Sequence, residues 1–187
     1  MSTMEQAIHH VLSSAARKKL SVDVLATEKS STRVNMQAHK VEQFSFSESH
    51  ELGVRVVSGP NEGIAYSESL DPASLEEMLD EAAANSRMIK KEISSELRPA
   101  AQLPSMEFIF NSQLQDVSAD KKIAAATALE AAAWDFDARI INVPHCTYRD
   151  VWMRHWVANS NGLMSQFQSN GCSAYVGCMA KDGQGLS

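Results

Sequence analysis

Histidine and cysteine are the residues of this sequence that could most readily do chemistry, because both bind zinc and both take part in catalysis. Two adjacent pairs occur among the six histidines and three cysteines, His9 with His10 and His145 with Cys146. Neighbouring residues point about 100° apart on a helix and to opposite faces of a strand, so neither pair suits one shared ion. We expect His9 and His10 to be solvated on a helix face. The sequence contains no His-Glu-x-x-His zinc motif.

The three cysteines, Cys146, Cys172 and Cys178, form an odd set without zinc-type spacing. Cys172 and Cys178 would share one face of a strand but lie about 20 Å apart, too far to bind one ion. We expect all three to be small buried apolar residues in a reducing compartment. We therefore assign no catalytic, cofactor-binding or metal-binding residue to this chain.

Other catalytic arrangements are less constrained by sequence. A Ser-His-Asp or Cys-His site stays open, since its members need to meet only in space. No Gly-x-Ser-x-Gly nucleophile elbow is present. Gly183-Gln184-Gly185 and the turn at Gly59 lack the strand-to-helix context of a phosphate-binding loop. Trp152 and Trp156 would share one face of a strand, and we expect a core position for them, with an interface as the alternative.

The stretch from Gly53 to Ser67 organises the elements that would position any site. Val54 and Val56 alternate with Arg55, and Ile64 and Tyr66 resume the alternation after a Gly- and Pro-containing turn. This pattern predicts two antiparallel strands. A helix follows, capped by Asp71 and extending to about Ile93. Its apolar stripe comprises Leu75, Met78, Leu79, Ala82, Ala83, Ser86 and Ile89.

The rest of the first half predicts a helix and further strands. The helix runs from Met4 to Lys19, with Ala7, Ile8, Val11, Leu12 and Ala15 on one side. Alternation predicts strands at 22–26 and 34–38 with a turn at Lys29 to Thr32, and another strand at Phe44 and Phe46 after a turn near His39. We expect a sheet of about five strands.

The second half shows the same order of elements. Ser118 caps a helix whose stripe is Ile123, Ala126, Leu129, Ala133 and Phe136. Extended segments at Tyr148 and 151–157, at 163–169 and at 173–180 surround turns at 159–162 and 181–185. This order predicts an internal duplication and an α+β fold of two related helix-and-antiparallel-sheet modules. The modules cover residues 1–93 and 118–187, and 94–117 is expected to be a Pro-containing linker over the surface, with a short ordered piece at 106–110 as the alternative. The second module is expected to be truncated, which leaves Ser173 to Ala180 without a neighbour on one side.

Composition narrows the class of protein. The 187 residues are 44% apolar and 21% charged, with a formal charge of −6, which is typical of a globular protein. No apolar run approaches the roughly 20 residues of a membrane span, and the N-terminus lacks a signal-peptide core. The basic groups, Arg17-Lys18-Lys19 and Lys90-Lys91, fall in the last turns of predicted helices. We expect a cytoplasmic protein that binds neither membrane nor nucleic acid.

The Gly53–Ser67 stretch with its Asp-Pro-capped helix resembles the N-terminal region of the PmbA/TldD family of metallopeptidase subunits, once described as modulators of DNA gyrase. Arg139-Ile140-Ile141-Asn142 and Ala158-Asn159-Ser160-Asn161-Gly162-Leu163-Met164 resemble later landmarks of the family, closer to its PmbA branch. The resemblance covers most of the chain, and none of its motifs is catalytic.

The resemblance implies a non-catalytic N-terminal fragment of a PmbA-like subunit in a peptidase that matures or degrades small peptides. Zinc would belong to a TldD-like partner subunit or to a downstream domain, and this chain would hold none. The partner would be such a subunit or a second copy, and the ligands would be peptides. The alternative is a non-enzymatic interaction module, for example one that acts on DNA gyrase.

Overall fold

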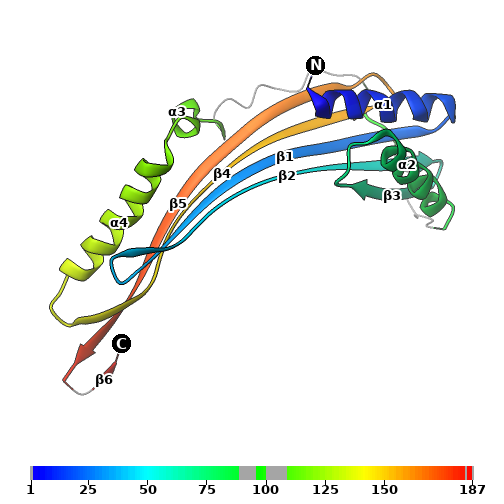
Figure 1. Ribbon diagram of the computed structural model, residues 1–187. Coiled ribbons are helices and arrows are strands. Elements are labelled where there is room, and N and C mark those ends of the chain that lie inside the picture. Colours follow the sequence, from blue (N-terminus) through cyan, green and yellow to red (C-terminus); the bar gives the residue numbers. More distant parts are fainter. Residues whose placement is uncertain (1, 89–95, 100–108, 184, 187) are drawn as a thin grey trace. The chain divides into compact units, whose positions relative to one another are not determined.

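The computed structural model describes residues 2–88, 96–99, 109–183 and 185–186. Ten helices and strands occur in these ranges (Figure 1). In chain order they are α1 Thr3–Arg17, β1 Ser21–Gln37, β2 Lys40–Ser58, β3 Asn61–Ser67, α2 Pro72–Ser86, α3 Ser112–Gln115, α4 Ala119–Asp135, β4 Ile140–Asn159, β5 Met164–Asp182 and β6 Gly185–Leu186. The fold is α+β, as the sequence predicts.

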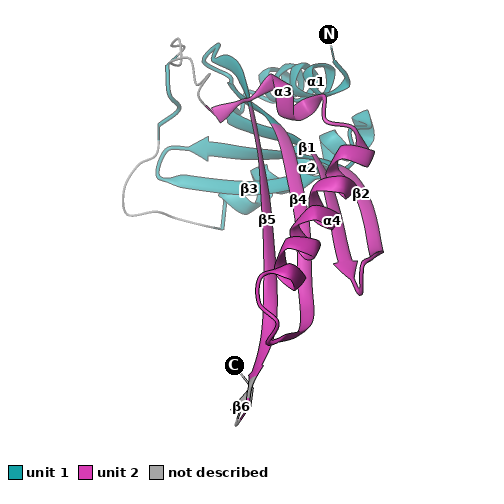
Figure 2. Ribbon diagram, turned by 90° about the vertical axis from the view of Figure 1, so that its left-hand side faces the viewer, with its two compact units in different colours: residues 1–28, 49–106, 154–168 teal, residues 29–48, 107–153, 169–187 magenta. Residues whose placement is uncertain are grey.

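The strands form one sheet in the order β3-β2-β1-β4-β5-β6. Short turns join β1 to β2, β2 to β3, and β4 to β5, so these neighbours are antiparallel. The chain divides into two compact units, coloured separately in Figure 2. Unit 1 contains residues 1–28, 49–106 and 154–168, and unit 2 contains 29–48, 107–153 and 169–187. The predicted division at residues 93 and 118 stays a prediction.

The core of unit 1 lies between two helices and the strands. Ser2 and Glu5 form a capping box that begins α1, and Asp71 caps α2 with Pro72 in its first turn. Helix α2 packs on β3 and contacts α1. The predicted stripes of both helices face this core, with Leu12 and Ala83 partly buried, apart from Ile89, which lies outside the described residues. The strands add Val22, Val24, Ala26, Leu52, Val54, Val56, Ala65, Trp156 and Ala158.

The β2–β3 hairpin forms in the predicted place, with Val54 opposite Ala65 and Val56 opposite Gly63. Its turn contains Gly59 at φ +60°, where a side chain would be strained. Gly63 is needed for another reason, since a Cβ there would lie 2.2 Å from both the Ala82 carbonyl oxygen and the Ser86 nitrogen of α2. Glycine therefore lets the helix approach the strand closely.

The core of unit 2 lies between α4 and its strands. Ser118 caps α4 by accepting a hydrogen bond from the Lys121 amide. Buried Ala126 and Ala133 pack with residues of β1 and β4, namely Val34, Met36, Val143, Cys146 and Tyr148. The β1–β2 turn places Ala38 and His39 at positive φ, and the amide of His39 donates to the buried Glu130 carboxylate at 3.1 Å. An acidic residue on α4 thus fixes this turn.

Several sequence predictions about strand and helix limits are wrong. No turn occurs at Lys29 to Thr32, because β1 continues from Ser21 to Gln37. Likewise β5 is one strand where two were expected. Helix α2 ends at Ser86, and the expected extension to Ile93 lies largely outside the described residues. The polar residues at 29–32 interrupt the alternation of apolar and polar side chains. The sequence alone therefore could not show that the same face of β1 is buried before and after them.

Other predictions in the second half are mixed. Phe136, expected in the stripe of α4, follows the helix as its C-cap and is 84% exposed. The turn at 159–162 is confirmed, and Gly162 takes φ +86° there. The 181–185 turn is shorter than predicted, because Lys181 and Asp182 pair with Leu186 and Gly185. The segment 106–110, the alternative ordered piece of the linker, lies largely outside the described residues.

Candidate functional site

A row of polar side chains crosses four neighbouring strands of unit 1. Arg55 of β2 is its centre. The Nε of Arg55 donates to Oδ2 of Asp23 on β1 at 3.0 Å, and Nη1 lies 3.4 Å from Oε2 of Glu62 on β3. On the other side of Asp23, its Oδ1 is 3.4 Å from the amide nitrogen of Asn159 on β4. The row Glu62–Arg55–Asp23–Asn159 links strands that are far apart in the sequence.

The buried Asn159 also organises the turn between β4 and β5. Its Oδ1 accepts hydrogen bonds from the amides of Asn161 at 3.0 Å and Leu163 at 3.1 Å. Its Nδ2 donates to the carbonyl of Arg98 at 2.8 Å. The adjacent Ser160 is tied to Val22 of β1 by two hydrogen bonds of 3.0 Å, one to the Val22 carbonyl and one from the Val22 amide. The turn is therefore held both to β1 and to the backbone at Arg98.

Two of the motifs that carry the family resemblance meet at Asp23. Arg55 belongs to the Gly53–Ser67 stretch, and Asn159 belongs to the later Ala158–Met164 landmark. Sequence reasoning missed Asp23 and Glu62. The available signal was an acidic residue between two buried valines, Val22 and Val24, directed to the opposite face.

The polar row is suited to holding strands and poorly suited to proton transfer. The guanidinium is flanked by two carboxylates, and a guanidinium does not deprotonate in proteins. Each carboxylate is in turn occupied by Arg55. Partly buried pairs of this kind are costly to break, because the remaining charge stays without its partner. We regard the row as a structural site.

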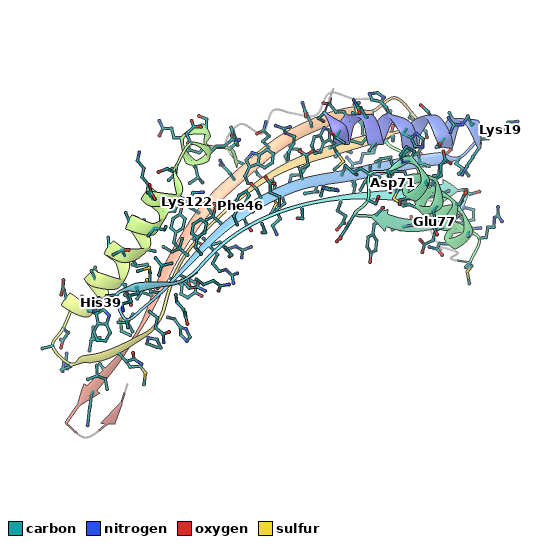
Figure 3. The ribbon with its side chains drawn as sticks, viewed as in Figure 1. Lys19, His39, Phe46, Asp71, Glu77 and Lys122 are labelled. Carbon is teal, nitrogen blue, oxygen red and sulfur yellow. The ribbon has the colours of Figure 1, made fainter. Side chains whose placement is uncertain are left out.

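A second polar cluster fixes α4 in unit 2. Lys122 of α4, labelled in Figure 3, places its Nζ 2.8 Å from Oδ2 of Asp150 and 3.1 Å from Oγ1 of Thr32. The hydroxyl of Tyr148 donates to the same Asp150 oxygen at 3.1 Å. Burial, and then the nearby Asp150 charge, raise the pKa of Tyr148. A tyrosine with a raised pKa stays protonated at neutral pH, so it is a poor general base. We therefore regard this cluster as structural as well.

A third cluster joins α1 to α2 around Glu76. The Glu76 carboxylate accepts a hydrogen bond from the Ser14 hydroxyl and lies 3.1 Å from Arg17, 2.9 Å from Lys18 and 3.3 Å from His10. The Ser14 hydrogen bond, and next the Lys18 ammonium, lower the pKa of Glu76 to about 2. The prediction of a merely solvated His10 is therefore wrong, whereas His9 is exposed. Arg17 and Lys18 lie at the end of α1, as predicted, and they also contact Glu76 of α2.

The remaining sequence candidates do not come together. Cys146 is buried, and its thiol contacts the Ala126 carbonyl oxygen at 3.5 Å, as a small core residue would. Burial raises the pKa of the Cys146 thiol. Cys172 and Cys178 are exposed, so the prediction that they are buried is wrong. Both lie on β5, and neither belongs to the two clusters of buried apolar residues.

Trp156 is in the core of unit 1, as predicted, whereas Trp152 is only half-buried. His145 is exposed and lies beside Gly177. Among residues 2–88, 96–99, 109–183 and 185–186, no three His, Cys, Asp or Glu side chains are grouped as metal ligands. Within these same ranges, no helix has the length and apolarity to cross a bilayer.

Exposed apolar side chains lie on the strands of unit 1. Leu25 is 61% exposed, Ile64 58% and Tyr66 70%. They alternate with the buried residues of β1 and β3 and so lie on the face away from the core. Gly53 lies between two of them, since a Cβ there would be 3.9 Å from both the Leu25 carbonyl oxygen and the Tyr66 Cβ. This leaves an open apolar strip beside the polar row.

Comparisons with known proteins show the class of protein to which this chain belongs. Residues 22–86 match the PmbA/TldA metallopeptidase domain 1, and residues 112–187 match the PmbA/TldA metallopeptidase central domain. The chain therefore carries two successive domains of one kind of metallopeptidase-related protein. It belongs to the PmbA/TldD family.

Individual relatives agree with this assignment. The metalloprotease PmbA homolog of Haemophilus influenzae is 23% identical over 171 residues, which cover 89% of this chain and 37% of the relative. A proposed modulator of DNA gyrase from Thermotoga maritima superposes with a TM-score of 0.82 at 17% identity, over 97% of this chain and 41% of that one. TldE from Thermococcus kodakarensis gives 0.77 at 15% identity, over 99% and 41%. The chain spans about two fifths of the length of these relatives.

Proposed function

We propose that this chain is the N-terminal, non-catalytic region of a PmbA-like subunit in a cytoplasmic metallopeptidase complex that processes or degrades small peptides. The observation that carries the proposal is the match to two successive family domains in their order along the chain. The relative named as a metalloprotease supports the hydrolase class. The polar clusters support a scaffold, because each charged group at their centres is occupied by a structural partner.

In this proposal the metal chemistry belongs to a TldD-like partner subunit or to a downstream domain. The region described here shapes the space in which a peptide is held. Its open apolar strip at Leu25, Ile64 and Tyr66 would contact apolar side chains of an extended peptide. The partner is a TldD-like subunit or a second copy of the chain.

Metal analysis combined with a peptidase assay tests the proposal. The purified 187-residue chain should hold no stoichiometric zinc and should not cleave a mixture of unstructured peptides. A longer PmbA-like subunit that contains this region, assembled with its metal-carrying partner, should cleave them. About one tightly held zinc per 187-residue chain, lost on substitution of His145 or Cys146, would overturn the assignment of a non-catalytic region.

An interaction module that acts on DNA gyrase is the second candidate, and it is favoured by the description of the Thermotoga maritima structure. The charge of −6 argues that any such action would go through protein contacts. We expect duplex DNA to bind no more tightly than about 10⁻⁴ M at physiological salt. A change in gyrase supercoiling rate on addition of the chain, with no effect on peptides in the assembled complex, would favour the second candidate.

A further inference from the structure

The first part of β2 is an unpaired edge of the sheet. Strand β2 lies between β3 and β1, but β3 pairs only from Leu52 onward. Residues 40–48 therefore have β1 on one side and, within the described chain, no strand on the other. All of them are exposed except the half-buried Ser45. An edge of this length is a template for another strand.

The side chains of this edge are unusual for one that stays unpaired. Phe44 is 43% exposed and Phe46 is 59% exposed, and as residues two apart they project from the same face. Figure 3 labels Phe46 on β2. Edges that avoid association carry charges and short or bulged strands, whereas apolar side chains in the middle of an edge favour association. The charged residues, Lys40, Glu42 and Glu48, lie toward the two ends of this segment.

Symmetry limits how two copies can pair through this edge. In an antiparallel pair related by a two-fold axis, opposite residues must project from the same face, so the axis passes through a residue. With the axis at Phe44, Lys40 of each copy lies opposite Glu48 of the other, and the two Phe44 side chains are neighbours. Both charge pairs are then attractive.

The neighbouring registers lack this complementarity. With the axis at Ser45, Glu42 lies opposite Glu48, which is repulsive. With the axis at Phe46, Glu48 lies opposite Phe44. The register centred on Phe44 is therefore selected by charge.

We propose that two copies of this chain associate through β2, in antiparallel register about Phe44, with Lys40 paired to Glu48 across the two-fold axis. The proposal goes beyond the proposed function by assigning the surface and register of self-association, and it does not depend on peptidase activity. Nine residues a side form a small interface. We expect micromolar association, as is typical of interfaces below about 1,200 Å².

Charge reversal tests the register. Sedimentation equilibrium of the wild-type chain should show a reversible dimer. Lys40→Glu and Glu48→Lys each turn both charge pairs repulsive, so each variant should associate at least tenfold more weakly, with circular dichroism unchanged. Mixing the two variants should give a heterodimer, because the introduced glutamate of one faces the introduced lysine of the other and the native Lys40 faces the native Glu48. The double variant K40E/E48K should again form a homodimer.

Lys121→Glu is the matched control, because Lys121 is an exposed lysine of the same unit on α4. It should associate as the wild type does. A wild-type chain that stays monomeric at 100-fold above the micromolar range would overturn the proposal, whatever other protein or peptide binds it. Dimers of K40E and E48K as stable as the wild-type dimer would overturn it as well, since they would place the interface elsewhere, for example on β5.

Discussion

Arg55 is the cation of the polar row. It lies between Asp23 and Glu62, and Asp23 is in turn 3.4 Å from Asn159. The guanidinium therefore compensates two carboxylates, one on each of the strands that flank β2. Arg55 stabilises the fold through this compensation, because a partly buried carboxylate that loses its counter-charge is unfavourable.

We predict that Arg55→Met lowers the free energy of unfolding by about 2–4 kcal/mol, because the partly buried Asp23 and Glu62 carboxylates then both lose their cation. Urea unfolding at pH 7, followed by circular dichroism, measures the loss. Arg139→Met is the control, since Arg139 forms an exposed pair with Asp137 and 62% of its side chain is accessible. It should leave the midpoint unchanged. Equal losses in the two variants would show that the polar row stabilises the fold no more than an exposed ion pair does.

Glu76 gives a prediction about pH. Its pKa is lowered to about 2, chiefly by the Ser14 hydroxyl and then by Lys18, from the unfolded value of about 4.3. Because the folded pKa is the lower one, ionised Glu76 stabilises the fold above about pH 4.3. This contribution disappears as the pH falls through about 2.

We expect Glu76→Gln to lose about 1 kcal/mol of unfolding free energy at pH 7, a value kept small because the site is partly exposed. The difference from the wild type should shrink steadily between pH 4 and pH 2. Glu77→Gln, an exposed neighbour on the same helix (Figure 3), should change stability little at any pH. Urea titrations at several pH values provide the comparison. A difference that persists unchanged at pH 2 would contradict the assigned pKa shift.

Among the elements, the contact of α2 with β3 depends most strictly on one residue type. Gly63 has no room for a Cβ, because two backbone atoms of α2 lie 2.2 Å from its ideal position. Backbone atoms cannot move aside as a flexible side chain can. Helix α2 must therefore move as a whole when any side chain is introduced at position 63.

We predict that Gly63→Ala lowers the free energy of unfolding by more than about 3 kcal/mol, as expected for overpacking against fixed backbone. Gly171→Ala is the control, since a Cβ at Gly171 meets no atom within 4 Å. Thermal unfolding of both variants checks the prediction. If Gly63→Ala unfolds at the wild-type temperature, α2 is less tightly fixed on β3 than the structure indicates.

Local patterns predicted the parts of the elements that depend on neighbouring residues. The caps at Asp71 and Ser118, the β2–β3 hairpin and the Asn159–Gly162 turn all follow from short-range chemistry. The continuity of β1 could not be predicted in this way. Polar residues at Lys29 to Thr32 read as a turn, although pairing with neighbouring strands keeps them extended.

The candidate site was harder to predict because its members are distant in sequence. Arg55 and Asn159 each belong to a motif that the sequence makes visible, but their link through Asp23 exists only in the folded sheet. The same holds for Glu130, which reads as a helical surface residue and is in fact buried beneath the β1–β2 turn. Periodicity places side chains on faces, and it does not reveal which faces meet.

At the scale of the whole molecule, the strand order gives a prediction for hydrogen exchange. Gly53 to Val57 lie in β2 between β1 and β3, so their amides should all be protected. Ser173 to Ala180 lie in β5, which has β4 on one side and β6 only at 181–182. In a dilute sample we expect alternate amides of this segment to exchange quickly, since half of them point away from β4. Uniform protection of Ser173 to Ala180 in a monomeric sample would show that something closes this edge.

The chain changes unit in the middle of strands. Unit 1 gives way to unit 2 within β1 after residue 28 and returns within β2 after residue 48, and further changes occur within β4 after 153 and within β5 after 168. No single cut in the gene separates one unit from the other. Recombination between relatives therefore cannot exchange a unit as one cassette, and a crossover anywhere from residue 29 to 168 would join strands of different parentage in the same sheet. Chimaeras of this region should fold only when the parents agree in strand register, so the four strands are expected to be inherited together.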